Sequence, residues 1–224
     1  MMPREPAAAI LLLIGTLAGM TVMALHPTGA DIVNAQNFAG HALLNRSVHG
    51  VAIASLPLLF LGFAGLCRRL GWPDIAVAGL VAYGFAAVAV MIAAVASGFI
   101  ATDLIERMFT ADAATLPILR VLMGYTHEWN QAFAAINVVA ASAAILLWSI
   151  AILKSGAMPR ALAYAGIAIG ILVPAVVISG HVRLEIHGFG AIVFLHGAWT
   201  IAVAAFLFRA DSRKGPASLD VEAH

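Results

Sequence analysis

Histidine is the residue type in this chain best suited to chemistry, because imidazole is the commonest metal ligand and transfers protons near neutral pH. Seven of the eight histidines lie at or near the ends of long apolar segments. Polar groups are costly at membrane depth, so histidines gathered at one set of helix ends predict a site there. The seven are His26, His41, His49, His127, His181, His187 and His196.

Three of them are our first candidates to ligate a transition metal or a b-type haem: His49, His127 and His196. His196 precedes Arg209 by 13 residues. This places it about 20 Å along a helix from that basic anchor. A buried imidazole at that depth needs a protein or cofactor partner. His181 and His187 complete the expected metal ligands, although their spacing of six matches no standard metal motif.

Polar residues beside these histidines are candidates to hydrogen-bond and orient the imidazoles. Asn130 and Asn137 share a helical stripe with His127, which should face the bundle interior or a wet cavity. For the two amides, an interhelical hydrogen bond without any ligand is an equal alternative. The full candidate set is Glu128, Asn130, Gln131, Asn137 and Glu185.

Two further histidines have a less specific setting. We interpret His26 as an interfacial residue that ends the first helix, beside Pro27. The sequence leaves two roles open for His41, the same interfacial role and a role in the site. If its segment is helical, His41, Asn45 and His49 share one face.

The composition indicates a polytopic membrane protein, because 62% of residues are hydrophobic, 10% are charged and the mean hydropathy is +0.99. A net charge of +1 without a basic patch argues against nucleic-acid binding. The single cysteine, Cys67, excludes an internal disulfide and a cysteine-based zinc site. No HExxH, CxxCH or phosphate-binding GxxxxGK[ST] motif is present.

Apolar stretches long enough to cross the bilayer as helices, which takes about 20 residues each, predict an all-α compact bundle over residues 1–209. A disordered cytoplasmic tail is expected over 210–224. The segment 116–123 is expected to form a separate short helix in the interface, with Pro117 near its first turn. The six predicted transmembrane helices are residues 7–25, 48–67, 75–100, 130–153, 161–179 and 188–208.

The lysines and arginines orient the bundle with both termini inside. On this assignment the outer segments hold four of the twelve basic residues, Arg46, Arg107, Arg120 and Arg183. The histidine-rich end then faces outward, which in a bacterial inner membrane is the periplasm. The other eight are Arg4, Arg68, Arg69, Lys154, Arg160, Arg209, Arg213 and Lys214.

The function expected from these features is electron transfer or a redox step on a small lipophilic substrate, at a metal or haem held by histidines from separate helices. The sequence specifies no reaction. One alternative is a small-solute or ion transporter with a 3+3 inverted repeat, in which Pro57 and Pro174 interrupt the second helix of each half. Another is a structural membrane subunit without a cofactor.

Overall fold

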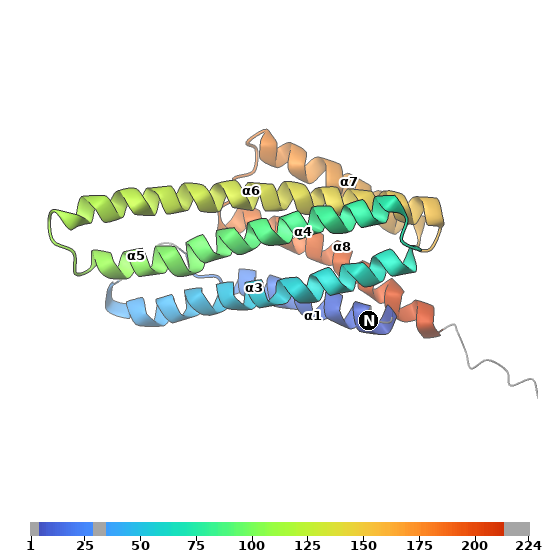
Figure 1. Ribbon diagram of the computed structural model, residues 1–224, viewed down its shortest axis with the longest axis horizontal. Coiled ribbons are helices and arrows are strands. Elements are labelled where there is room, and N and C mark those ends of the chain that lie inside the picture. Colours follow the sequence, from blue (N-terminus) through green and yellow to red (C-terminus); the bar gives the residue numbers. More distant parts are fainter. Residues whose placement is uncertain (1–4, 29–34, 213–224) are drawn as a thin grey trace, which may run out of the picture.

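The structure is a computed structural model that describes residues 5–28 and 35–212, and every regular element in these ranges is helical. Long helical rods run roughly side by side along the molecule (Figure 1). Their bounds are α1 (Glu5–Ala24), α3 (Phe38–Arg69), α4 (Asp74–Val95), α5 (Ala101–Met108), α6 (Thr115–Ser155), α7 (Arg160–Ile178) and α8 (Ile186–Ser212). A 3₁₀ turn, η1 (Ala35–Asn37), precedes α3, and a π-helical turn, η2 (Ala96–Ile100), joins α4 to α5.

Within the described residues, six helical rods, counting α4, η2 and α5 as one, are long and apolar enough to cross a membrane, as in a multi-pass membrane protein. Glu5 and the end of α8 lie at the same end of the bundle (Figure 1). We name this the proximal end, and the opposite end, with the α5–α6 connection, the distal end. The predictions that concern Arg4, Arg213, Lys214, His224 and the tail from residue 213 lie outside the described residues.

Aromatic packing fills the proximal half of the bundle. Trp148 on α6 is fully buried and stacks on Phe63 of α3 with ring centroids 4.2 Å apart. Its indole N–H donates to the carbonyl of Ala76 at 3.1 Å, which ties α6 to the start of α4. The indole ring of Trp199 on α8 is stacked parallel to that of Trp148, with ring centroids 6.4 Å apart. Buried indoles with satisfied N–H groups make this half a tightly packed anchor for the distal half.

Small residues let neighbouring helices approach closely, as membrane helices require. A Cβ at Gly15 of α1 would lie 3.2 Å from the backbone oxygen of Ser55 on α3. A Cβ at Gly170 of α7 would lie 2.9 Å from the backbone oxygen of Ser142 on α6. Gly15 and Gly170 therefore mark close contacts between α1 and α3 and between α6 and α7.

The distal ends of the helices differ from the sequence-based expectation. α3 begins at Phe38, before the predicted start at 48, and α6 begins at Thr115, before the predicted start at 130. The separate interfacial helix over 116–123 is wrong, because these residues form the first turns of α6. No strong helix breaker interrupts the run: Pro117 lies in the first turn, where it is tolerated, and one internal glycine costs only about 1 kcal/mol.

The 41 residues of α6 span about 60 Å, roughly twice the hydrocarbon thickness of a bilayer. The distal turns of α6 therefore extend well beyond a membrane-spanning length, beside those of α3 and α5 (Figure 1). The guanidinium of Arg46 on α3 forms salt bridges with two carboxylates of α5, at 2.6 Å from Asp103 and 3.4 Å from Glu106. Asp103 and Glu106 share one face of α5, as their spacing of three predicts.

Candidate metal site

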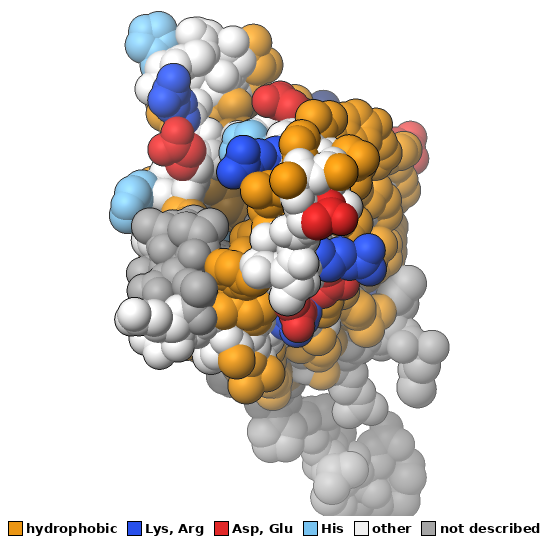
Figure 2. Space-filling view, turned by 90° about the vertical axis from the view of Figure 1, so that its left-hand side faces the viewer, with side chains coloured by type: hydrophobic (Ala, Val, Ile, Leu, Met, Phe, Trp, Pro, Cys, Tyr) orange, Lys and Arg blue, Asp and Glu red, His pale blue; other side chains and the backbone are white. Residues whose placement is uncertain are grey.

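The distal half of the bundle contains a partly open cavity of about 510 Å³, which we name the distal cavity. Its lining comes from the end of α1, from α3, α4 and α6, and from the α7–α8 connection. Figure 2 shows histidine and charged side chains gathered at this end of the molecule. Four of the histidines line the cavity: His26, His49, His127 and His187.

His26 and His49 face each other across the α1–α3 contact. Their Nε2 atoms lie 3.3 Å apart, and the two rings meet edge to face with centroids at 4.8 Å. His49 is 8% exposed and His26 is half-buried. The two imidazoles come from segments 23 residues apart, so the pair exists only because α1 and α3 pack side by side.

The hydrogen bonds of the other ring nitrogens fix which atoms carry protons. Nδ1 of His26 lies 2.8 Å from the carbonyl oxygen of Pro27, and Nδ1 of His49 lies 2.8 Å from the carbonyl oxygen of Asn45. A carbonyl oxygen can only accept, so each Nδ1 donates its hydrogen. In a neutral imidazole the other nitrogen, Nε2, is then an unprotonated acceptor. Burial lowers the pKa of His26, which favours this neutral form.

Two neutral imidazoles in this tautomer bring two unprotonated nitrogens close together. Neither Nε2 atom can donate to the other, so the 3.3 Å contact between His26 and His49 is not a neutral hydrogen bond. A cation placed between the nitrogens would satisfy both. Metal-binding histidines commonly donate their second ring N–H to a backbone carbonyl, which is the arrangement of both rings here.

A short polar network holds His49 in place. The amide of Asn45 donates to the carbonyl of Ser97 at 3.1 Å and to the hydroxyl of Thr102 at 2.9 Å. The Thr102 hydroxyl donates in turn to the carbonyl of Gly98 at 2.9 Å. These contacts secure η2 against α3, and π-helical turns of this kind are frequent at functional sites.

The remaining candidates from the sequence fall into two groups. His127, His187, Glu185, Asn130 and Gln131 line the distal cavity with the histidine pair. The amide of Gln131 also donates to the carbonyl of Leu184 at 3.4 Å.

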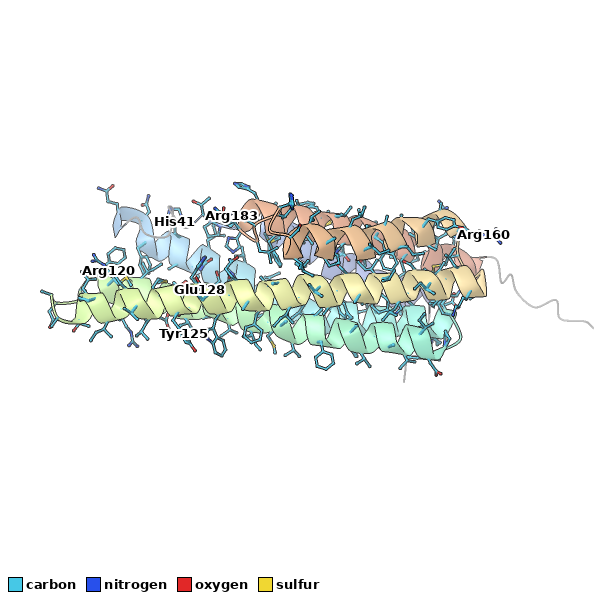
Figure 3. The ribbon with its side chains drawn as sticks, turned by 90° about the horizontal axis from the view of Figure 1, so that it is seen from above. His41, Arg120, Tyr125, Glu128, Arg160 and Arg183 are labelled. Atoms are coloured by element: carbon cyan, nitrogen blue, oxygen red, sulfur yellow. The ribbon has the colours of Figure 1, made fainter. Side chains whose placement is uncertain are left out.

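Other candidates do not line the distal cavity. His181 is exposed, with Nδ1 2.8 Å from the hydroxyl of Ser179. Glu128 is exposed on the distal part of α6, in the same stretch of the helix as Arg120 and Tyr125 (Figure 3). The full set of five histidines is not brought together. Within residues 5–28 and 35–212 no group of three or more His, Cys, Asp or Glu side chains is close enough to hold a metal ion.

His196 lies apart from the pair, in a deeper cavity that we name the inner cavity. Its Nε2 atom is 3.2 Å from the hydroxyl of Ser142, so the deep imidazole does have a protein partner. The inner and distal cavities share six lining residues, including Met23 and Ala52. His196 is therefore a neighbour of the His26–His49 site and not a member of the pair.

The polar stripe of α6 faces the bundle, as expected. Asn130 donates to the carbonyl of Ala93 at 3.0 Å, and Asn137 donates to the carbonyl of Ala86 at 2.9 Å. Both acceptors belong to α4, so the amides form the interhelical seam that was one of the two expected roles. Each amide also lines a cavity, Asn130 the distal one and Asn137 the inner one.

The sequence interpretation slightly preferred an interfacial role for His26 and did not name it as a ligand, and so missed half of the pair. Little in the sequence indicated that His26 belongs to the site, because His26 follows the last turn of α1 and precedes Pro27 and Thr28. The shared face of Asn45 and His49 was visible as a spacing of four residues, but their partners on η2 and at the end of α1 were not. Comparison of the chain with known protein families, with curated proteins and with solved structures finds no match.

Proposed function

We propose that the protein is a bacterial inner-membrane protein that binds one transition metal ion between His26 and His49, with the distal end facing the periplasm. The observation that carries the proposal is the approach of two unprotonated Nε2 atoms to 3.3 Å while both Nδ1 atoms donate to carbonyls. The proposed role is electron transfer or a redox step that involves a small lipophilic molecule. The redox role requires a redox-active ion such as copper or iron, because zinc has no redox chemistry.

The distance between the nitrogens supports a tetrahedral metal ion. Two metal–imidazole bonds of about 2.0–2.1 Å that meet at a tetrahedral angle place their nitrogens roughly 3.3–3.4 Å apart. The observed separation of His26 and His49 is 3.3 Å. Imidazole ligands suit zinc, copper, iron and nickel, and copper binds most tightly among the divalent first-row ions.

The same distance favours a metal ion over a b-type haem between these two rings. Axial histidines on opposite faces of a haem point at the iron along one line, which would set the nitrogens about 4 Å apart at bonds of about 2.0 Å. The macrocycle would also have to pass between the rings, and ring centroids only 4.8 Å apart leave no room for it. The pair as it stands supports ligation of an ion.

Two protein ligands leave coordination positions open. The distal cavity supplies water or further side chains for them, since His127, His187 and Glu185 share its lining. An open coordination position is what distinguishes reactive metal sites from structural ones. The arrangement therefore suits a site where the metal meets a small molecule.

The proposal is tested on full-length protein purified with a histidine-free affinity tag in detergent. Zn²⁺ is titrated against a chromophoric chelator, and copper, iron, nickel and zinc are quantified in the protein as isolated. We expect one tight zinc site in the wild type and its loss in His26→Ala and in His49→Ala. The matched control is His181→Ala, because His181 is exposed and outside the distal cavity lining; this variant keeps the site.

Retained affinity in both pair variants, or equal loss in all three, contradicts the assignment of the ligands. A stoichiometric Soret band in the protein as isolated contradicts the choice of an ion over a haem.

A further inference from the structure

The inner cavity has a volume of about 180 Å³, is partly open, and lies between α1, α3, α4, α6 and α8. Apolar side chains make up most of its lining, among them Leu59, Phe63 and Ile145. An engineered apolar cavity of about 150 Å³ in another protein binds benzene, so the inner cavity is large enough for a molecule of one ring.

The lining also contains a polar group without a partner. Thr16 of α1 is 6% exposed, and its hydroxyl has no hydrogen-bond partner among the described residues. A buried hydroxyl that makes no hydrogen bond is unfavourable, and buried polar groups are almost always paired. The Oγ1 atom of Thr16 is itself covered, so the side chain would have to turn toward the cavity for a bound molecule with one oxygen atom to supply the missing partner.

Other polar side chains enter the cavity from different helices. Asn137 of α6 and His196 of α8 both line it. Asn137 donates one N–H to α4, and its amide has a second N–H and a carbonyl oxygen beyond that bond. A mostly apolar pocket with a few convergent polar groups is the usual form of a small-molecule site.

We propose that the inner cavity binds a lipophilic molecule with a single ring and one hydroxyl or carbonyl oxygen, which hydrogen-bonds to Thr16. The inner cavity shares Val22, Met23, Ala52, Val90, Ala94 and Phe189 with the distal cavity, so this molecule would lie next to the His26–His49 pair. The binding inference rests on the inner cavity alone. Only its interpretation as the site of the small molecule in the redox role rests on the proposed metal function.

The test uses two fluorinated probes of nearly equal size, 4-fluorophenol and 4-fluorotoluene, of which only the phenol can hydrogen-bond through oxygen. Their binding to the protein in lipid nanodiscs is measured by ¹⁹F NMR, with empty nanodiscs to subtract partition into lipid. We expect saturable binding of both, with about fivefold tighter binding of the phenol from one net hydrogen bond. Thr16→Val, which is similar in shape, should remove this preference and keep the binding of 4-fluorotoluene.

A second variant fills the cavity. A Cβ at Gly19, which lines the inner cavity, would meet no atom within 4 Å. Gly19→Leu should therefore fold and block the binding of both probes. Gly124→Leu, equally free of contacts but outside the cavity, should also fold and should leave the binding of both probes unchanged.

Four results overturn the inference: no saturable binding beyond empty nanodiscs, equal affinity of the wild type for both probes, a phenol preference that survives in Thr16→Val, or unchanged binding in Gly19→Leu. His49→Ala separates the two proposals, because His49 does not line the inner cavity. Loss of zinc with intact probe binding in this variant supports the inner site independently of the metal. Equal loss of probe binding in His49→Ala and Gly19→Leu contradicts a separate inner site.

Discussion

Gly98 lies so close to His49 that any side chain at position 98 would overlap the Cβ and Cγ atoms of the His49 side chain. The glycine is in the π-helical turn η2, and the imidazole is in the middle of the distal half of α3. The contact leaves His49 no room to move toward η2. It therefore helps to set where Nε2 of His49 lies relative to His26.

Gly98→Ala should displace His49 and weaken zinc binding by about tenfold or more. Overpacking of a well-packed site also costs about 1–3 kcal/mol of unfolding free energy. Chelator competition gives the affinity, and thermal unfolding in detergent gives the stability. The control is Gly84→Ala on α4, where the added Cβ would make an ordinary contact of 3.6 Å with Phe60. Equal zinc affinity in the two variants would show that Gly98 does not position the site.

Asn45→Ala should destabilise the distal half of the bundle by about 1–3 kcal/mol, because it removes the hydrogen bonds that the Ser97 carbonyl of η2 and the Thr102 hydroxyl of α5 accept. Asn45 is 1% exposed and donates to both Ser97 and Thr102. Asn137→Ala removes one interhelical hydrogen bond and should cost less, about 0.6 kcal/mol. Denaturant unfolding in detergent compares the two. A smaller loss for Asn45→Ala than for Asn137→Ala would contradict the role given to this network.

The start of α6 should lose protection at low pH through Asp112. Its carboxylate accepts from the backbone amide of Thr115 at 2.7 Å, and hydrogen bonds from Thr115 lower the pKa of Asp112 below its ordinary value of 3.8. Because the folded pKa is the lower one, the stabilisation is present above the ordinary pKa and is lost as pH falls through the lowered one.

Hydrogen exchange of the Thr115 amide, corrected for intrinsic rates, measures this effect between pH 6 and pH 3. Asp112→Ala should show low protection that no longer changes with pH. A wild-type protection factor that stays constant over this range, or a pH dependence that persists in Asp112→Ala, would contradict the assignment.

The sequence predicted the number of apolar helices and the face of α6, because both depend on local composition and periodicity. The continuity of α6 through Gly124 was not predicted, since polar residues around His127 suggested a helix end, and helix propensity alone does not place boundaries. The His26–His49 pair was not predicted because it depends on how α1 packs against α3. The position of η2 depends on the contact of Ser97 and Gly98 with Asn45, which no periodicity reveals.

The orientation in the membrane is tested with single cysteines in a Cys67→Ser background. Gly40→Cys and Thr115→Cys lie near the distal starts of α3 and α6, and Leu184→Cys lies in the α7–α8 connection; the basic residues assign all three positions to the outside. We expect all three to react with an impermeant thiol reagent in intact cells. Reaction only after lysis would place the distal end inside the cell and would contradict a periplasmic site.

X-ray absorption at the zinc K-edge tests the central claim most directly, because it counts the imidazoles on the metal. Full-length protein loaded with one equivalent of Zn²⁺ should show a nitrogen and oxygen shell near 2.0–2.1 Å with outer-shell scattering from two imidazole rings. In His26→Ala the imidazole count should fall to one or the zinc should be lost, while His181→Ala should match the wild type. A wild-type spectrum without imidazole scattering, or one that is unchanged in both His26→Ala and His49→Ala, would contradict a metal ion held between His26 and His49.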